Sequence, residues 1–193
     1  MNAINCRDKL IDITIDLINK HNGDVEKVTI REITAASGVS VGLINYHFGN
    51  KNNLITLCTQ KIISQVITAF KPDMTVGKNL DAYEAGKVRL KLAACQVFYF
   101  LFTNPSISKL SIMSDYENYT GDCNSWSSIN GFSNIIGDAI ESEDKKQKIA
   151  FYLVNSMQAA FLKSRTERRF LGYDFEVGAE RKRYIEELVD ALM

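Results

Sequence analysis

The chain has 193 residues, of which 46% are hydrophobic and 24% are charged, and its 23 Lys and Arg balance its 23 Asp and Glu to a formal net charge of zero. This composition excludes a disordered or collagen-like chain and provides enough apolar side chains for a core. The neutral total excludes any argument for nucleic-acid binding from net charge, so such an argument has to come from a local motif.

Apolar residues recur with helical spacing along almost the whole chain, and no sustained alternation predicts a strand. The predicted fold class is therefore all-α, with an N-terminal helix-turn-helix module of three helices, a second helical domain and about nine helices in total. We place the domains at residues 1–50 and 51–193, connected by the fourth helix. The predicted helices cover residues 3–21, 41–48, 51–70, 80–102, 106–119, 125–141, 144–169 and 180–193, and a short second helix begins near residue 29 or 30 and ends before Gly38. Residues 171–177 are expected to be a connection.

Two short helices near the N-terminus have clear start and stop residues. Thr29 and Glu32 have the spacing of a capping box, Gly38 can take the positive φ of a sharp turn, and Ser40 can cap the next helix. Two short helices joined by such a turn predict a helix-turn-helix, whose second helix fits the major groove of DNA. Residues 33–72 contain no Asp or Glu, but carry Lys51, Lys61 and Lys71, so this stretch does not repel phosphate.

The segment from residue 29 to residue 54, TIREITAASGVSVGLINYHFGNKNNL, resembles the DNA-binding motif of the tetracycline-repressor (TetR) family. The resemblance lies in the Thr-x-Arg-Glu-Ile start, the Gly-Val-Ser turn, the Tyr-His-Phe cluster and the Lys-x-x-Leu that opens the fourth helix. Together with the caps, it implies contacts with double-stranded operator DNA by Thr29, Arg31, Ser40, Val41, Gly42, Leu43, Asn45, Tyr46, His47 and Lys51.

Simpler roles remain open for several of these residues. Thr29 can serve as a helix cap, Arg31 as a solvated side chain paired with acids, and His47 as a partly buried side chain. Lys51 can be a surface charge, although a lysine at the start of a helix gains nothing from the helix dipole.

The resemblance also implies that the C-terminal region binds a small-molecule effector and forms a homodimer. Candidate pocket residues are Cys95, Phe98, Tyr99, Phe102, Met113, Tyr116, Trp126, Phe132 and Phe161, for which plain core is the alternative. Candidate dimer contacts on the last two helices are Leu153, Met157, Phe161, Tyr184, Ile185, Leu188 and Leu192.

No catalytic group of residues emerges. Gly-Val-Ser-Val-Gly at residues 38–42 has the spacing of a nucleophile elbow, but no strand precedes it. The four cysteines form no Cys-x-x-Cys pair, so we expect reduced packing thiols, no metal site and no cofactor. The most apolar run, residues 92–102, is shorter than the about 20 residues of a membrane span, and no signal peptide is visible.

These observations predict a cytoplasmic, non-enzymatic transcription regulator, usually a repressor, that binds a near-palindromic operator as a homodimer and responds to a ligand. Two alternatives remain: a helical regulator controlled by a protein partner or by no ligand, and a helical interaction module that does not bind DNA.

Overall fold

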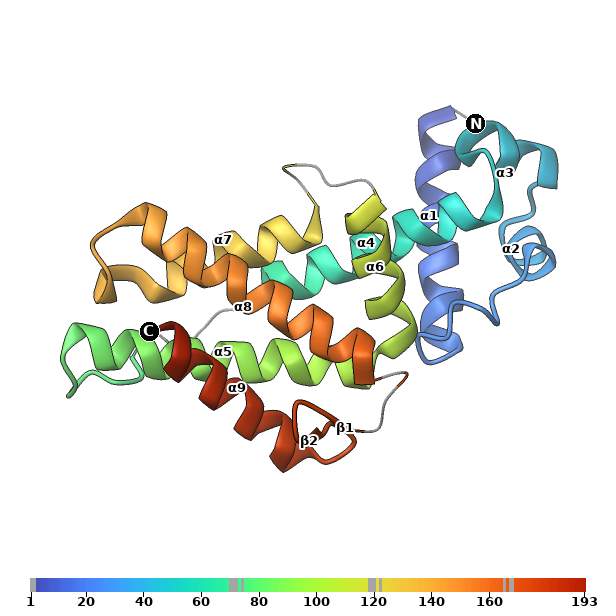
Figure 1. Cartoon of the computed structure of the whole chain (residues 1–193). Helices are drawn as coiled ribbons and strands as arrows, with labels where there is room; N and C mark the ends of the chain where they lie inside the picture. Colours follow the sequence, from blue (N-terminus) through green and yellow to red (C-terminus); the bar gives the residue numbers. More distant parts are fainter. Residues whose placement is uncertain are drawn as a thin grey trace. The chain divides into compact units, whose positions relative to one another are not determined.

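The computed structural model describes residues 3–69, 73, 75–117, 121, 123–164, 166 and 169–193. Within these ranges the chain forms nine α-helices, one short 3-10 helix and a two-stranded sheet (Figure 1), which confirms the predicted all-α class. Residues 70–72 and 118–119, on which predicted helix ends and Lys71 fall, lie outside the described residues. The α-helices are α1 (Ala3–Lys20), α2 (Ile30–Ser37), α3 (Val41–Phe48), α4 (Lys51–Ala69), α5 (Ala82–Thr103), α6 (Pro105–Glu117), α7 (Asn124–Ile136), α8 (Glu143–Ser164) and α9 (Gly178–Leu192).

Two predicted helices were too long. The helix predicted over residues 125–141 ends at Ile136, because Gly137 has a φ of +52° and leaves the helix, and the 3-10 turn η1 (Gly137–Ala139) follows. The helix predicted over residues 144–169 ends at Ser164.

A small hairpin, which the sequence did not predict, follows α8. Its strands β1 (Arg169–Phe170) and β2 (Tyr173–Asp174) pair antiparallel, with Phe170 opposite Tyr173. Leu171 and Gly172 connect them with φ values of +52° and +84°. Positive φ values at both central positions are typical of a two-residue hairpin turn. Leucine rarely adopts a positive φ, so the sequence gives little indication of this turn.

The chain divides into two compact units. The first comprises residues 1–66 and 104–119, and the second residues 67–103 and 120–193. The domain boundary predicted after residue 50 thus falls inside the first unit, because α4 contributes to its core: Cys58 is fully buried, with its Sγ 3.6 Å from the carbonyl oxygen of Ile11. In α6, Ser114 accepts a hydrogen bond of 3.2 Å from Gln60.

In the second unit, α5 packs against α7, α8 and α9, with α8 also contacting α7 and α9 (Figure 1). At the surface, Lys87 and Lys91 of α5 approach Asp190 of α9 at 2.8 and 2.7 Å. In the part of the chain that the structure describes, no helix is long and apolar enough to cross a membrane.

Candidate nucleic-acid interface

The helix-turn-helix begins with a fully formed capping box on α2. The Thr29 hydroxyl accepts the backbone N–H of Glu32 at 3.2 Å, and the Glu32 carboxylate accepts the backbone N–H of Thr29 at 2.9 Å. Ser40 caps α3 by accepting the N–H of Leu43 at 3.3 Å. Both helices therefore start where the sequence predicted them to start.

The turn between the two helices depends on Gly38. Its φ of +72° is the left-handed conformation that ends α2, and its N–H donates to the carbonyl of Thr34 at 2.9 Å. Ile33 of α2 and Ile44 of α3 are both fully buried. The apolar side of each helix is thus fixed in the core of the first unit, and the opposite side of α3 faces solvent.

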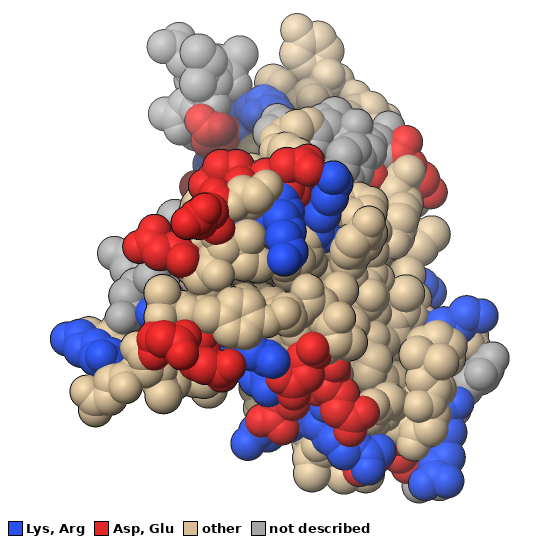
Figure 2. Space-filling model, turned by 60° about the vertical axis from the view of Figure 1, so that its left-hand side comes forward, with Lys and Arg blue, Asp and Glu red and all other residues tan. Residues whose placement is uncertain are grey.

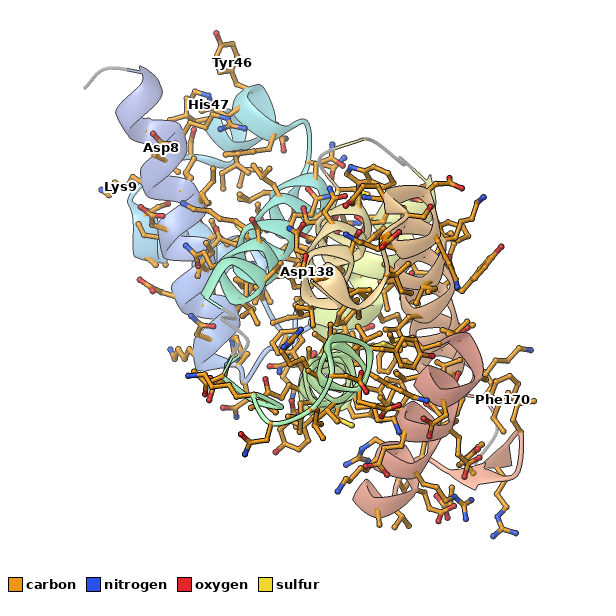
Figure 3. All side chains as sticks on the ribbon, turned by 90° about the vertical axis from the view of Figure 1, so that its left-hand side faces the viewer. Asp8, Lys9, Tyr46, His47, Asp138 and Phe170 are labelled. Carbon is orange, nitrogen blue, oxygen red and sulfur yellow. The ribbon has the colours of Figure 1, made fainter. Side chains whose placement is uncertain are left out.

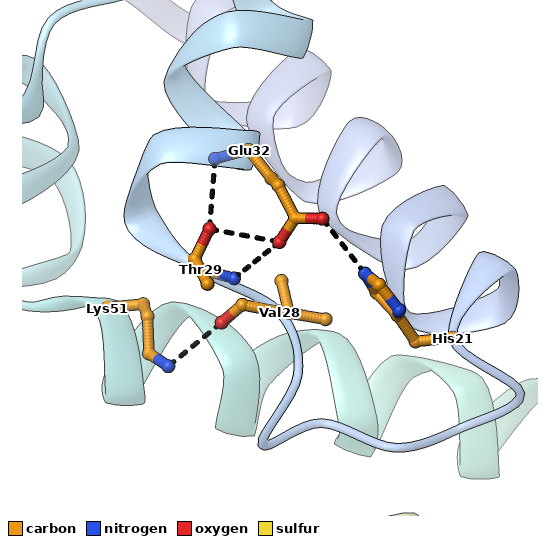
Figure 4. A network of polar contacts seen from close by, with 5 residues as sticks. All are labelled: His21, Val28, Thr29, Glu32 and Lys51. Carbon is orange, nitrogen blue, oxygen red and sulfur yellow. Dashed lines mark hydrogen bonds and ion pairs between the residues drawn. The ribbon is translucent and has the colours of Figure 1, made fainter.

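A polar network joins the ends of α1, α2 and α4 (Figure 4). Nε2 of His21 lies 3.0 Å from Oε1 of Glu32, and the Lys51 ammonium donates to the carbonyl oxygen of Val28 at 2.9 Å. The backbone N–H of Thr29, the His21 ring and the Thr29 hydroxyl all hydrogen-bond to the Glu32 carboxylate, which lowers the pKa of Glu32 from 4.5 to about 2. The network ties the loop before α2 to the helices on both sides of it.

One member of this network, His21, is not predictable from the sequence. It lies in the turn after α1, and its contact with Glu32 depends on the path of the loop that follows. Thr29 is engaged as a cap and also donates to Glu32 at 2.9 Å. Lys51 uses one of its three N–H donors on Val28, so its predicted phosphate contact stays a prediction.

The solvent-facing side of α3 carries four exposed residues: Val41, Gly42, Asn45 and Tyr46. Tyr46 is 81% exposed and points away from the ribbon in Figure 3. A large aromatic side chain without cover on a fixed helix is typical of a contact surface. Among the other predicted DNA contacts, Arg31 on α2 is exposed, whereas Leu43 and His47 on α3 are half-buried.

The charges around the motif are partly paired inside the first unit. Lys61 lies 3.1 Å from Asp12, and the Lys9 ammonium donates to the carbonyl of Ser37 at 3.4 Å. The Arg7 guanidinium stacks on Phe48, 5.4 Å from its ring centre. On the face drawn in Figure 2, acidic and basic side chains lie among one another, so the neutral total charge is not divided into two large opposite regions there.

Comparisons with known proteins point to the same segment. The family model described as "Bacterial regulatory proteins, tetR family" matches residues 11–57, which include the helix-turn-helix. The HTH-type transcriptional regulator BetI of Klebsiella pneumoniae (strain 342) is 34% identical over 86 residues, 42% of this chain and 43% of that protein. BetI of Escherichia coli O45:K1 (strain S88 / ExPEC) is also 34% identical, over 88 residues that cover 46% of this chain and 41% of that protein.

Residues 11–57 thus carry the segment that is characteristic of the TetR family. The chain spans less than half the length of the curated relatives that it matches. A crystal structure of a TetR transcriptional regulator from Rhodococcus sp. RHA1 shares the fold over 100% of this chain and 98% of that one, with a TM-score of 0.61 and 15% sequence identity.

The residues that were predicted to line an effector pocket belong to two different units. Met113 and Tyr116 belong to the first unit and are exposed. The other predicted pocket residues belong to the second unit, where Tyr99 is 61% exposed. There the structure buries Phe98, Phe132 and Phe161, and half-buries Cys95, Phe102 and Trp126.

Three of these rings belong to one aromatic cluster. Phe102 contacts Phe98 and Phe161, with ring centres 5.1 and 5.4 Å apart. Phe175 and Tyr184 complete the cluster, at 5.7 and 5.6 Å from Phe98. The sequence does not mark Phe175 as a core residue, because it lies in the predicted connection over residues 171–177. The alternation Tyr173-x-Phe175 beside a glycine is the available signal.

The predicted dimer contacts are mostly buried within the single chain. Leu188 and Leu192 on α9 are half-buried. Those enclosed by the second unit are Leu153, Met157, Phe161, Tyr184 and Ile185. Exposed apolar side chains on α8 are instead Phe151 and Tyr152. All four cysteines are free thiols, and within the described ranges no cluster of three or more His, Cys, Asp or Glu is suited to a metal ion.

Proposed function

We propose that this protein is a transcription regulator of the TetR family, and specifically a repressor, that binds a near-palindromic operator as a homodimer and is released from it by a small molecule. The observation that carries the proposal is the exposed side of α3, with Tyr46 81% exposed on a helix whose other side is fixed in the core. In a helix-turn-helix, this second helix enters the major groove of DNA.

We propose a homodimer because a near-palindromic operator has two equivalent half-sites, one for each copy of the chain. Two recognition helices about 34 Å apart reach successive major grooves on one side of the duplex. We assign the contact to α8 and α9, and among their side chains to Phe151 and Tyr152 with the half-buried Leu188 and Leu192, because buried side chains offer no surface to a second copy. Sedimentation of the wild type and of Tyr152→Arg tests this; the substitution should yield monomers.

Effector response requires that a ligand bind one geometry of the dimer more tightly than another. We place the ligand in the second unit, where Cys95, Phe102 and Trp126 are half-buried, and we expect a small molecule with an apolar body. A screen for compounds that both raise the melting temperature and release operator DNA tests this role. If no compound does both and a protein partner releases the DNA, control by that partner replaces the proposal.

DNA binding is tested by the dependence of affinity on salt. A random duplex pool selects the operator, and the logarithm of its affinity should fall linearly with the logarithm of salt concentration. Lys51→Ala should weaken binding to all sequences and reduce that slope by about one. Lys61→Ala is the matched control, because Lys61 is on the same helix but is paired with Asp12 at 3.1 Å. Tyr46→Ala should weaken operator binding without changing the circular dichroism spectrum.

If the wild-type protein shows no salt-dependent binding to any duplex, the DNA-binding proposal fails, and the helical interaction module takes its place. If Lys51→Ala keeps the wild-type slope, the hydrogen bond of Lys51 to Val28 is its main role.

A further inference from the structure

The outward side of α3 has an unusual chemistry for a DNA-reading surface. Val41 and Asn45, and likewise Gly42 and Tyr46, are four residues apart, so they share one side of the helix. None of these four side chains is charged. Across residues 30–48 the sequence contains one Lys or Arg, Arg31, and it belongs to α2.

This composition limits which bases the helix reads directly. Guanine is read most often by Arg or Lys, which bond to its O6 and N7, and the four outward residues of α3 offer neither. Adenine is read by the amide of Asn or Gln at N6 and N7, and the methyl group of thymine by an apolar side chain. Asn45 supplies the amide and Val41, 45% exposed, supplies the apolar contact.

Asn45 is available for this role. Its side chain is exposed and has no hydrogen-bond partner among the described residues, whereas its backbone carbonyl accepts the N–H of Gly49 at 2.8 Å and so belongs to the helix end. The cap of α3 is supplied by Ser40, so the fold does not engage the Asn45 amide for that purpose. Both the donor and the acceptor of the amide thus face outward, as bidentate recognition of adenine requires.

We propose that α3 reads two A·T base pairs in each half of the operator, about two base-pair steps apart, with Asn45 bonded to an adenine and Val41 packed on the methyl group of a thymine. The two residues are one helical turn apart, about 6 Å along the axis, which corresponds to about two base-pair steps. This assignment rests on the proposed function and specifies its ligand as an operator with two A·T pairs in each half-site. Any guanine contact near it falls to Arg31 on α2.

The test compares sequences selected from a random duplex pool by the wild type, Asn45→Ala and Asn45→Arg. The wild type should select one invariant adenine in each half-site. Asn45→Ala should lose that preference by roughly 10- to 100-fold, and Asn45→Arg should replace it with guanine. Asn19→Ala is the matched control, because Asn19 is an exposed asparagine on α1, and it should select the wild-type sequence.

The second contact is tested on the selected operator by replacing single thymines with deoxyuridine, which removes the methyl group alone. A single such replacement at the contacted position of one half-site should weaken wild-type binding about fourfold, as expected for one buried methyl group. The same replacement should weaken the binding of Val41→Ala by a smaller factor, because alanine covers less of the methyl group.

A selected operator whose base preferences do not respond to Asn45 or Val41, or that has G·C pairs at the responsive positions, overturns this inference and leaves the proposed function standing. If no sequence is enriched and binding does not depend on salt, both fail.

Discussion

Residues on the outward side of α3 and in the aromatic cluster around Phe161 were both predicted to contact a partner. In the structure the first are exposed to solvent, whereas Phe161 is buried. Tyr46 is 81% exposed, whereas Phe161 is fully buried and stacks edge-on against Phe102, with ring centres 5.4 Å apart. Both residues are aromatic and both are on helices, so residue type does not separate a binding surface from a core. In the first unit, the caps at Thr29 and Ser40 and the turn at Gly38 fix α3, and they thereby determine that Tyr46 faces solvent.

The largest expected effect tests the core side of this comparison. Phe161→Ala removes a fully buried ring and should lower the free energy of unfolding by about 3–5 kcal/mol. Urea denaturation followed by circular dichroism measures it. Tyr99→Ala, at a ring 61% exposed, is the matched control and should change the free energy by less than about 0.5 kcal/mol. Equal losses in the two variants would mean that Phe161 is not part of the core.

The same contrast explains how much the sequence could predict. Helix starts and turns depend on residues close together in sequence, such as Thr29 with Glu32 or Gly38 after Ser37, so α2 and α3 were placed correctly. Tyr46 was among the DNA contacts that the resemblance implied, and the structure exposes it on α3. Local chemistry therefore predicted the positions of α2 and α3, on which most of the candidate interface lies.

What could not be predicted depends on contacts between residues far apart in sequence. The His21 contact with Glu32 and the Lys51 contact with Val28 arise from the path of one loop. In the second unit, an apolar residue at a helical spacing is equally compatible with a core, a pocket and a dimer contact. The hairpin was missed because Leu171, at a φ of +52°, occupies a position for which glycine or asparagine is the usual signal.

The next effect in size tests the caps that hold the outward side of α3 in place. Thr29→Ala removes the hydroxyl that accepts the N–H of Glu32 at 3.2 Å, and should lower the free energy of unfolding by about 1 kcal/mol. Thr34→Ala is the matched control, because Thr34 is inside α2 and alanine favours a helix, so it should be neutral or slightly stabilising. A neutral Thr29→Ala would mean that the capping box adds nothing to stability.

The Glu32 carboxylate makes part of this stability depend on pH. Its pKa is lowered to about 2 in the folded protein, so the unfolded chain binds its proton more readily. The stabilisation is complete above pH 4.5 and is lost as the pH falls from there towards 2. Urea denaturation across this range should show a shallower loss for Glu32→Gln than for the wild type, and Glu26→Gln, in the preceding loop, should keep the wild-type slope. Identical slopes for Glu32→Gln and wild type would contradict the role of the carboxylate.

The smallest expected change in stability is the sharpest test of the comparison, because it separates folding from binding at a single residue. A Cβ on Gly42 would lie 3.8 Å from the Ser40 hydroxyl, an ordinary contact, so nothing in the described protein requires glycine there. Gly42→Ala should therefore stabilise the protein by about 0.5–1 kcal/mol, because glycine disfavours a helix. The same methyl group would stand between the α3 backbone and the DNA, so operator affinity should fall.

Gly38→Ala is the contrasting control: its φ of +72° strains any other residue, so it should destabilise the turn. If Gly42→Ala raises the free energy of unfolding and lowers operator affinity, the glycine at position 42 is required for DNA contact and not for folding. A variant that is more stable and binds the operator like the wild type would remove Gly42 from the contact surface and confine base reading to Val41, Asn45 and Tyr46.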